Sequence, residues 1–128
     1  MLTTPVIAST LPASCEAIAA VLRASSLRYG TERILQDGIE VALAGAGFEV
    51  RREVNLTVKD RIDFMVGTVG IEVKIGGTLN DAIRQLHRYA ASDKVSELLL
   101  VTSRAMLARV PSELDGKPVR AVYVGSAF

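Results

Sequence analysis

The chain has 128 residues, of which 49% are hydrophobic and 23% are charged, so its composition is that of one globular domain and excludes a disordered chain. Fifteen lysines and arginines face fourteen acidic residues, and the resulting net charge of +1 excludes a polycation while leaving room for a local basic patch. The single cysteine, Cys15, excludes an intrachain disulfide framework and a multi-cysteine zinc site, and the low aromatic content (5%) argues against a surface built to stack many bases.

The sequence shows no segment typical of a transmembrane helix or a signal peptide. No apolar run approaches the roughly 18–20 residues that span a bilayer, and the first residues lack the charged start and long apolar stretch of a signal peptide. We therefore expect a cytoplasmic protein without a membrane partner. We expect one domain over 1–128, divided into an N-terminal extension with a short helix (1–28), a core (29–103) and a C-terminal helix and strand (104–128).

Two helices are predicted in the first third of the chain. An alanine-rich helix is expected over about Cys15 to Ala24, with Ser14 as its N-cap. A stronger helix is expected over Glu32 to Ala46 with Thr31 as N-cap, because apolar residues recur there at spacings of three and four.

The period then changes to two, which is typical of half-buried strands. The segment 48–58 places three apolar residues on one face: Val54, Leu56 and Val58. Two further strands, 61–66 and 71–75, are separated by a short glycine-bounded connection. Together the three strands predict an antiparallel meander.

A third helix is predicted after Thr78 or Asn80 and runs to about Ser92. The remaining elements are a buried central strand over 97–102, a short helix near 104–109 and, after a turn at Asp115–Gly116, a last strand over 119–124. We therefore predict an α/β fold with a mixed central sheet flanked by helices, and with the short helix as an N-terminal addition.

The chemically informative residues lie in the second and third strands of the meander. Side chains alternate between the faces of a strand, so Glu72 and Lys74 point the same way, about 6.6 Å apart, opposite Ile71, Val73 and Ile75. The short turn brings the preceding strand alongside, and Asp63 is then expected to face the same pocket. Two carboxylates and one amine are therefore predicted to share a site.

Oxygen ligands of this kind suit Mg²⁺ or Mn²⁺. Asp63 and Glu72 are the predicted metal ligands, and the backbone carbonyl of Val73 is a third candidate. Such a metal acidifies a bound water and offsets charge that develops on a phosphodiester oxygen. Lys74 is then placed to orient that water or to stabilise the transition state by its charge.

Asp63, eight intervening residues and then Glu72-Val73-Lys74 resemble the signature of the PD-(D/E)XK nuclease superfamily. The resemblance covers roughly Tyr29 to Ser103, and the chain departs from the literal motif by having Ile62 where the motif has proline. It implies an αβββαβ restriction-endonuclease-like core and a Mg²⁺- or Mn²⁺-dependent deoxyribonuclease that is selective for DNA structure, of bacterial or phage type.

Further positions match subfamilies of this superfamily. Glu32 matches a helix glutamate that completes the metal site, with Glu40 as a weaker candidate, in a layout similar to Holliday-junction resolvases. Gln85 and Tyr89 are similar to a Gln-x-x-x-Tyr pair of phage and repair exonucleases. Four residues apart on a helix, both can face one site, where Gln85 is expected to orient the lysine, the water or a phosphate.

Basic residues are the candidates for contacting DNA. They are Arg51, Arg52, Lys59 and Arg61 around the first hairpin, and Arg84 and Arg88, with Tyr89, on the third helix. Such phosphate contacts are independent of sequence. The alternative for the charged residues is a solvated surface, and for Tyr89 it is core packing. His87 is expected to be solvated and Cys15 to be a small packed residue.

Alternative functions stay open at this point. One is a non-catalytic nucleic-acid-binding or scaffold protein on the same fold, and another is a structural or partner-binding module in which Asp63, Glu72 and Lys74 are merely solvated. Endonuclease or exonuclease action, DNA or RNA, and repair, restriction, phage processing or a toxin are not separated. Because so short a chain offers little surface for a duplex, a homodimer or larger complex is expected, with the 15–24 helix as a candidate contact.

Overall fold

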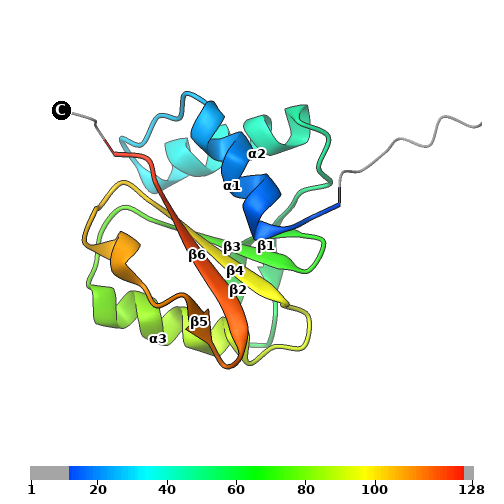
Figure 1. Ribbon diagram of the computed structural model, residues 1–128, viewed down its shortest axis with the longest axis vertical. Coiled ribbons are helices and arrows are strands. Elements are labelled where there is room, and N and C mark those ends of the chain that lie inside the picture. Colours follow the sequence, from blue (N-terminus) through cyan, green and yellow to red (C-terminus); the bar gives the residue numbers. More distant parts are fainter. Residues whose placement is uncertain (1–11, 126–128) are drawn as a thin grey trace, which may run out of the picture.

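The computed structural model describes residues 12–125, and within these it contains three α-helices and a six-stranded mixed sheet, which confirms the predicted α/β class (Figure 1). In chain order the elements are α1 (Cys15–Ala24), α2 (Glu32–Gly45), β1 (Arg51–Asn55), β2 (Arg61–Val66), β3 (Val69–Lys74), α3 (Leu79–Ala90), β4 (Glu97–Thr102), the 3-10 helix η1 (Leu107–Arg109), β5 (Glu113–Leu114) and β6 (Lys117–Tyr123). None of the helices in this range has the length and apolar character required to cross a membrane.

The strands are arranged in the order β1-β2-β3-β4-β6-β5. β1, β2 and β3 form the predicted antiparallel meander, whereas β3, β4 and β6 run parallel to one another. α3 provides the crossover from β3 to the parallel strand β4. β5, which was not predicted, pairs antiparallel with β6 through the turn at Asp115 and Gly116, both of which have positive φ.

Each helix begins where its capping residue predicts. The side-chain oxygens of Ser14, Thr31 and Thr78 each accept a hydrogen bond, 3.1 Å long, from a backbone N–H in the first turn of the helix that follows. Thr78, and not Asn80, is therefore the cap of α3. α1 buries its apolar residues, among them Cys15 and Ile18, inside the chain, as expected for Cys15.

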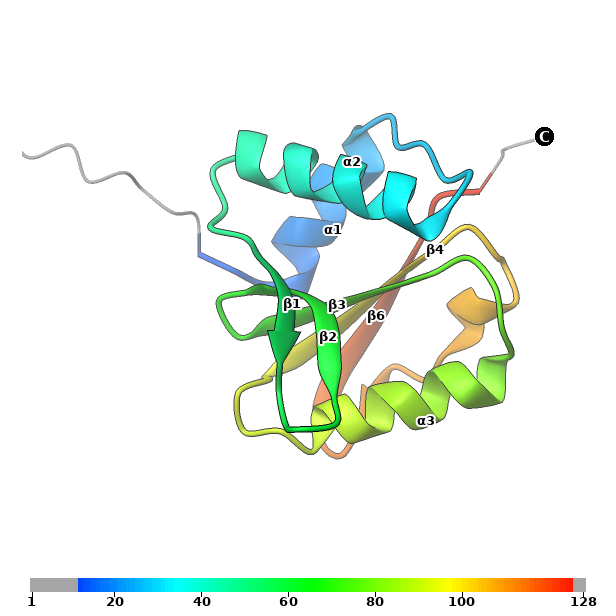
Figure 2. The same ribbon diagram turned by 180° about the vertical axis from the view of Figure 1, so that it is seen from behind.

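The helices cover both faces of the sheet and create two apolar cores. α1 and α2 lie on one face and α3 on the other (Figures 1 and 2). The first core includes Leu35, Phe64, Ile71 and Val101, and the second includes Ile62, Leu86, Leu98 and Leu100. The central strands β3 and β4 are buried on both faces, which explains why β4 reads as a continuous apolar run.

β2 contributes to both cores and changes sides near its start. Ile62 packs in the core beneath α3, although Phe64, two residues later, packs in the core beneath α1 and α2. The backbone pairing of β2 with β3 ends at Phe64 and Ile71. Asp63 therefore lies where the pairing of β2 with β3 ends, and its carboxylate belongs to the site described below.

Several predicted element ends are wrong. The strand predicted over 48–58 is limited to β1, and Val58 is fully exposed in the turn that follows, where the Thr57 hydroxyl accepts hydrogen bonds from the N–H groups of Lys59 and Asp60. Leu56 is buried, as the alternation predicts. The short helix near 104–109 is reduced to the single 3-10 turn η1.

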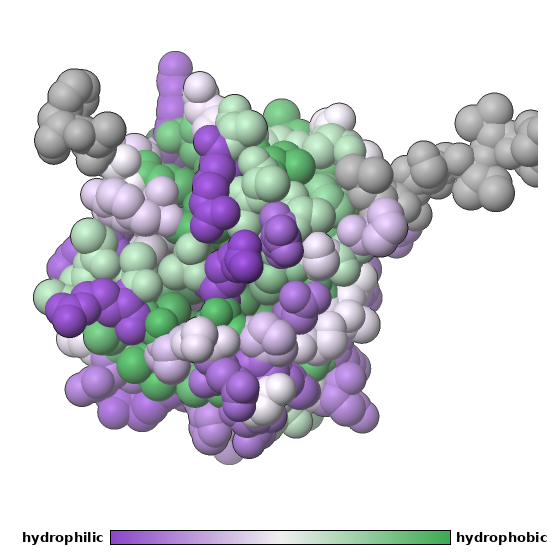
Figure 3. Space-filling model, viewed as in Figure 1, coloured by the Kyte–Doolittle hydropathy of each residue, from purple (hydrophilic) through white to green (hydrophobic). Residues whose placement is uncertain are grey.

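The exposed surface in the view of Figure 3 mixes polar and apolar residues, with the polar ones more frequent over α3 and β5. The large hydrophobic side chains that are exposed within residues 12–125 come from several elements: Ile34, Val41, Val58, Met106 and Tyr123. Scattered exposure of this kind is ordinary. The expected homodimer stays a prediction.

Gly70 is a position where β3 has no room for a side chain. A Cβ atom there would lie 2.6 Å from Cδ1 of Ile62 and 3.1 Å from Cδ2 of Leu98, both of which are fully buried. Gly70→Ala is expected to lower the free energy of unfolding by about 1–3 kcal/mol in chemical denaturation. Gly76→Ala is the matched control, because nothing lies within 4 Å of its Cβ and its φ is not positive; equal stabilities of the two variants would contradict this packing.

Candidate metal and catalytic site

Asp63, Glu72 and Lys74 come together beside the gap between β2 and β3. The Lys74 Nζ lies 3.5 Å from Oε2 of Glu72. Oδ2 of Asp63 accepts a hydrogen bond of 2.8 Å from the N–H of Val73, and Oε1 of Glu72 accepts one of 3.3 Å from the N–H of Asp63. The structure thus brings together the two acids and the amine that strand alternation places on one face.

The end of the β2–β3 ladder explains this arrangement. Beyond Phe64 and Ile71 no further β2–β3 pair is formed, so the N–H of Val73 has no backbone acceptor on β2. The Asp63 carboxylate takes the place of that acceptor. Each acid therefore accepts a main-chain hydrogen bond from the other acid's strand, and a buried donor that would be costly to leave unpaired is satisfied.

The site places two carboxyl groups where solvation is poor, which disfavours their ionised forms. Glu72 is only 4% exposed, and burial, together with the charge of Asp63, raises its pKa to about 8 although Lys74 acts in the opposite direction. Burial also raises the pKa of Asp63, against the lowering effect of the Val73 N–H. A cation bound between the two carboxylates would offset both penalties.

The donor set fits a hard divalent ion that keeps several waters. Within residues 12–125 no group of three or more acidic, histidine or cysteine side chains is assembled for a metal, so the site offers the carboxylates of Asp63 and Glu72 alone. Mg²⁺ and Mn²⁺ suit such a pair, because Mg²⁺ is usually held by one or two carboxylates together with water and substrate phosphates. The carbonyl of Val73 stays a predicted ligand; the N–H of the same residue donates to Asp63.

The two helix glutamates have different surroundings. Glu32, in the exposed first turn of α2, lies near enough to Asp63 for its charge to contribute to the raised pKa of that residue. Its role as an outer helper of the site stays a prediction. Glu40 lies 3.0 Å from the guanidinium of Arg52, so it takes part in an ion pair between α2 and β1.

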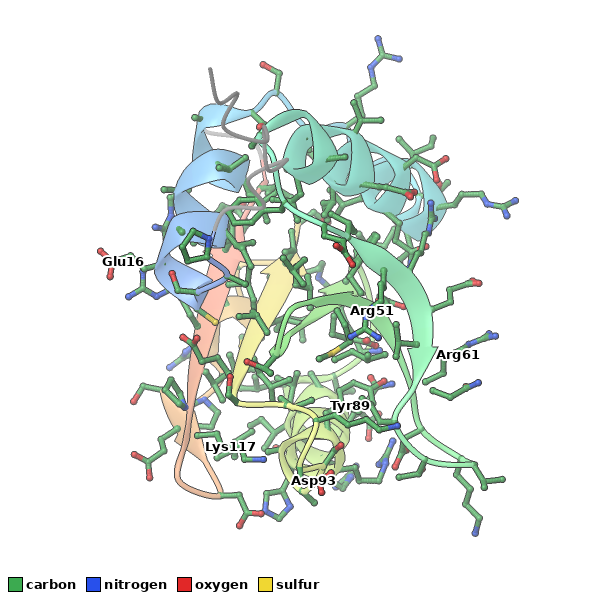
Figure 4. All side chains as sticks on the ribbon, turned by 90° about the vertical axis from the view of Figure 1, so that its right-hand side faces the viewer. Glu16, Arg51, Arg61, Tyr89, Asp93 and Lys117 are labelled. Carbon is green, nitrogen blue, oxygen red and sulfur yellow. The ribbon has the colours of Figure 1, made fainter. Side chains whose placement is uncertain are left out.

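Gln85 and Tyr89 link α3 to β2 near the site through hydrogen bonds. Gln85 Nε2 donates to the Tyr89 hydroxyl (2.8 Å), which in turn donates to the carbonyl of Arg61 (3.1 Å). Tyr89 is 1% exposed, and burial followed by the charges of Glu72 and Asp63 raises its pKa. Figure 4 shows Tyr89 between α3 and the β1–β2 hairpin.

These contacts correct the prediction for Tyr89 and add a partner for Gln85. A direct nucleic-acid contact through Tyr89 does not fit its burial, and core packing with a hydrogen-bonded hydroxyl describes it instead. The amide nitrogen of Gln85 donates to the Tyr89 hydroxyl, and the expected role of Gln85 in orienting the lysine, the water or a phosphate stays a prediction.

Two of the predicted basic contacts are engaged within the protein. Arg52 joins β1 to α2 by hydrogen bonds to Asp37 (2.7 Å), Glu40 (3.0 Å) and Gln36 (3.0 Å), and its guanidinium carbon lies 5.6 Å from the Phe64 ring centroid. Arg84 pairs with Asp81 one turn earlier on α3. Arg52 therefore stabilises the packing of α2 and is not a free phosphate ligand.

The other basic residues are accessible. Arg51, Lys59 and Arg61 are exposed on the β1–β2 hairpin, where Figure 4 shows Arg51 and Arg61. Arg88, also exposed, lies 3.1 Å from Asp60. Asp60 and Asn55, which the sequence analysis did not select, line the same hollow as Lys59, Arg61 and Arg88. The contact between Asp60 and Arg88 on α3 has no signal in the local sequence, because the two residues are 28 positions apart. His87 is exposed, as predicted.

No family model, curated protein or solved structure gives a significant match to this chain. Inference about function therefore depends on the geometry of the site.

Proposed function

We propose that this chain is a Mg²⁺- or Mn²⁺-dependent nuclease that hydrolyses phosphodiester bonds of DNA, on a restriction-endonuclease-like core of the PD-(D/E)XK type. The observation that carries the proposal is the convergence of Asp63, Glu72 and Lys74 at the point where β2 leaves β3. The order α2, β1, β2, β3, α3, β4 agrees with the αβββαβ arrangement of such a core.

The proposed roles follow from the chemistry of each group. Asp63 and Glu72 would hold the metal, which supplies an acidified water and a positive charge beside the phosphate. Lys74, a cation 3.5 Å from Glu72, would stabilise the negative charge that develops on the phosphodiester oxygens or orient the attacking water. Glu32 would act as an outer helper, and Gln85 with Tyr89 would hold the floor of the site.

The proposal is tested by a cleavage panel. Supercoiled, linear, nicked, branched and single-stranded substrates are incubated with the purified protein in Mg²⁺, in Mn²⁺ and in EDTA. We expect cleavage of at least one DNA substrate with either metal and none in EDTA. Asp63→Asn is the matched inactive variant, because the asparagine oxygen can still accept the Val73 N–H while the ligand charge is lost.

Two outcomes of the panel would contradict the proposal. Cleavage that persists in EDTA and in Asp63→Asn would show that the Asp63–Glu72 cluster and its metal are not responsible for it. Binding of DNA without cleavage under any metal condition would favour a non-catalytic nucleic-acid-binding protein on this fold.

A further inference from the structure

A polar hollow of about 420 Å³ lies between the β1–β2 turn and the C-terminal half of α3. Figure 2 shows the hairpin reaching down to that end of α3. Asn55, Lys59, Asp60 and Arg61 line it from the hairpin, and Gln85 and Arg88 line it from the helix. Two segments that are distant in sequence thus create one concave surface.

The hollow carries an excess of positive charge. Lys59, Arg61 and Arg88 face a single carboxylate, that of Asp60. Arg88 donates to Asp60 through Nε, which leaves the terminal nitrogens of its guanidinium without an ion-pair partner among residues 12–125. Guanidinium groups bind phosphate oxygens in a forked geometry, so this lining is suited to a phosphate rather than to a cation or an apolar ligand.

The hollow adjoins the carboxylate cluster. Tyr89 contributes to its wall, and the hydroxyl of the same residue lies near the carboxylates of Glu72 and Asp63 and donates to the carbonyl of Arg61. Gln85, which also lines the hollow, donates to that hydroxyl. Tyr89 and Gln85 therefore join the hollow to the cluster, and a polymer with a repeating phosphate is the ligand that would reach both.

We infer that this hollow, which we call the hairpin–α3 pocket, binds a backbone phosphate of the nucleic-acid strand next to the nucleotide that is cut. The inference rests on the proposed function, because it takes the strand as the ligand. The inferred contacts to the nucleic-acid strand come from Lys59, Arg61 and Arg88. Arg52 and Arg84 are not expected to contact it. Because the lining groups recognise phosphate, the pocket contributes affinity and positioning without sequence preference.

The test measures binding without cleavage. A fluorescent single-stranded oligonucleotide is titrated with the full chain in Ca²⁺ and in EDTA, and anisotropy is recorded at several salt concentrations. Arg61→Gln and Arg88→Gln are each expected to weaken binding by about 5-fold and to lower the log–log salt slope by about one. Arg84→Gln, one turn away on α3 and paired with Asp81, is the matched control and is expected to bind as the unmodified protein does.

Asp60→Asn provides a change in the opposite direction. It removes the one carboxylate of the pocket and releases Arg88, so we expect binding about 2- to 5-fold tighter. Circular dichroism melts of each variant verify folding. Arg61→Gln is the variant least expected to change stability, because Arg61 has no ion-pair partner within residues 12–125.

The outcomes separate this inference from the proposed function. Equal affinities of Arg61→Gln, Arg88→Gln and Arg84→Gln would overturn the pocket even if the protein cuts DNA. The expected pattern of affinities in a protein that cuts nothing would support the pocket as a strand site and leave the nuclease proposal refuted. If inorganic phosphate or a mononucleotide binds and Arg61→Gln abolishes that binding while strand affinity is unchanged, the pocket is a small-anion site and the strand assignment is wrong.

Discussion

Lys74→Ala is expected to lower the rate of DNA cleavage about 100-fold or more while leaving DNA affinity within about 2-fold of the unmodified protein. Lys74 is the cation of the Asp63–Glu72 cluster, and no other lysine or arginine within residues 12–125 pairs with either acid. Its removal takes away charge at the reacting phosphate and leaves the distant phosphate contacts intact. The loss therefore falls on the chemical step.

The measurement uses single-turnover cleavage in saturating Mg²⁺ together with anisotropy in Ca²⁺. Lys94→Ala is the matched control, because Lys94 is exposed in the loop between α3 and β4 and is distant in sequence from the site. Two results would contradict a catalytic role: cleavage by Lys74→Ala at the unmodified rate, or a parallel loss of cleavage and affinity. The second would make Lys74 a binding residue.

Glu72→Gln is expected to make the protein more stable at alkaline pH and much less stabilised by Mg²⁺. In the folded protein, burial, together with the charge of Asp63, raises the pKa of Glu72 from its ordinary value of 4.5 to about 8. Between these two pH values Glu72 is mostly ionised in the unfolded chain and mostly protonated in the folded protein. The unmodified protein therefore loses stability as pH rises from about 4.5 to 8, and the full penalty, on the order of a few kcal/mol, is present above pH 8.

Glutamine removes this penalty, because it has no proton to lose and keeps an oxygen that accepts the N–H of Asp63. Below pH 4.5 the two proteins should have similar stabilities, and at pH 8.5 the variant should be more stable. Mg²⁺ favours the ionised glutamate, so it should raise the melting temperature of the unmodified protein at pH 8.5, and by much less that of Glu72→Gln.

Thermal unfolding at pH 4.5, 6.5 and 8.5, with EDTA and with Mg²⁺, measures both effects. Glu49→Gln, which changes an exposed glutamate before β1, is the control and should follow the unmodified protein. If the melting temperature of Glu72→Gln depends on pH as that of the unmodified protein does, Glu72 is not the group that causes the loss of stability at alkaline pH. Equal stabilisation by Mg²⁺ in both would place the ion elsewhere.

The sequence predicted most elements because their determinants are local. Capping residues defined the starts of α1, α2 and α3, and the change from helical to alternating period located the meander. The convergence of Asp63, Glu72 and Lys74 was also predictable, because two of them are two residues apart in one strand and the third lies across a short turn.

Side-chain partners from distant segments were beyond local patterns. Arg52 appears in the sequence beside Arg51 as one of a basic pair, but its contacts with Asp37, Glu40 and Gln36 depend on how α2 packs on the sheet. The pairing of Arg88 with Asp60 joins residues 28 positions apart. Val58 continues the alternation of β1, yet the Thr57 turn has already ended the strand, because a side-chain acceptor competes with the ladder there.

The passage of β2 from one core to the other has a consequence for how the candidate site depends on folding. Asp63 stands at the seam between the layer formed by α1 and α2 and the layer formed by α3, with Ile62 anchored in one and Phe64 in the other. Loosening either layer shifts one of these anchors and with it the carboxylate. The position of the Asp63 carboxylate therefore depends on the packing of both layers.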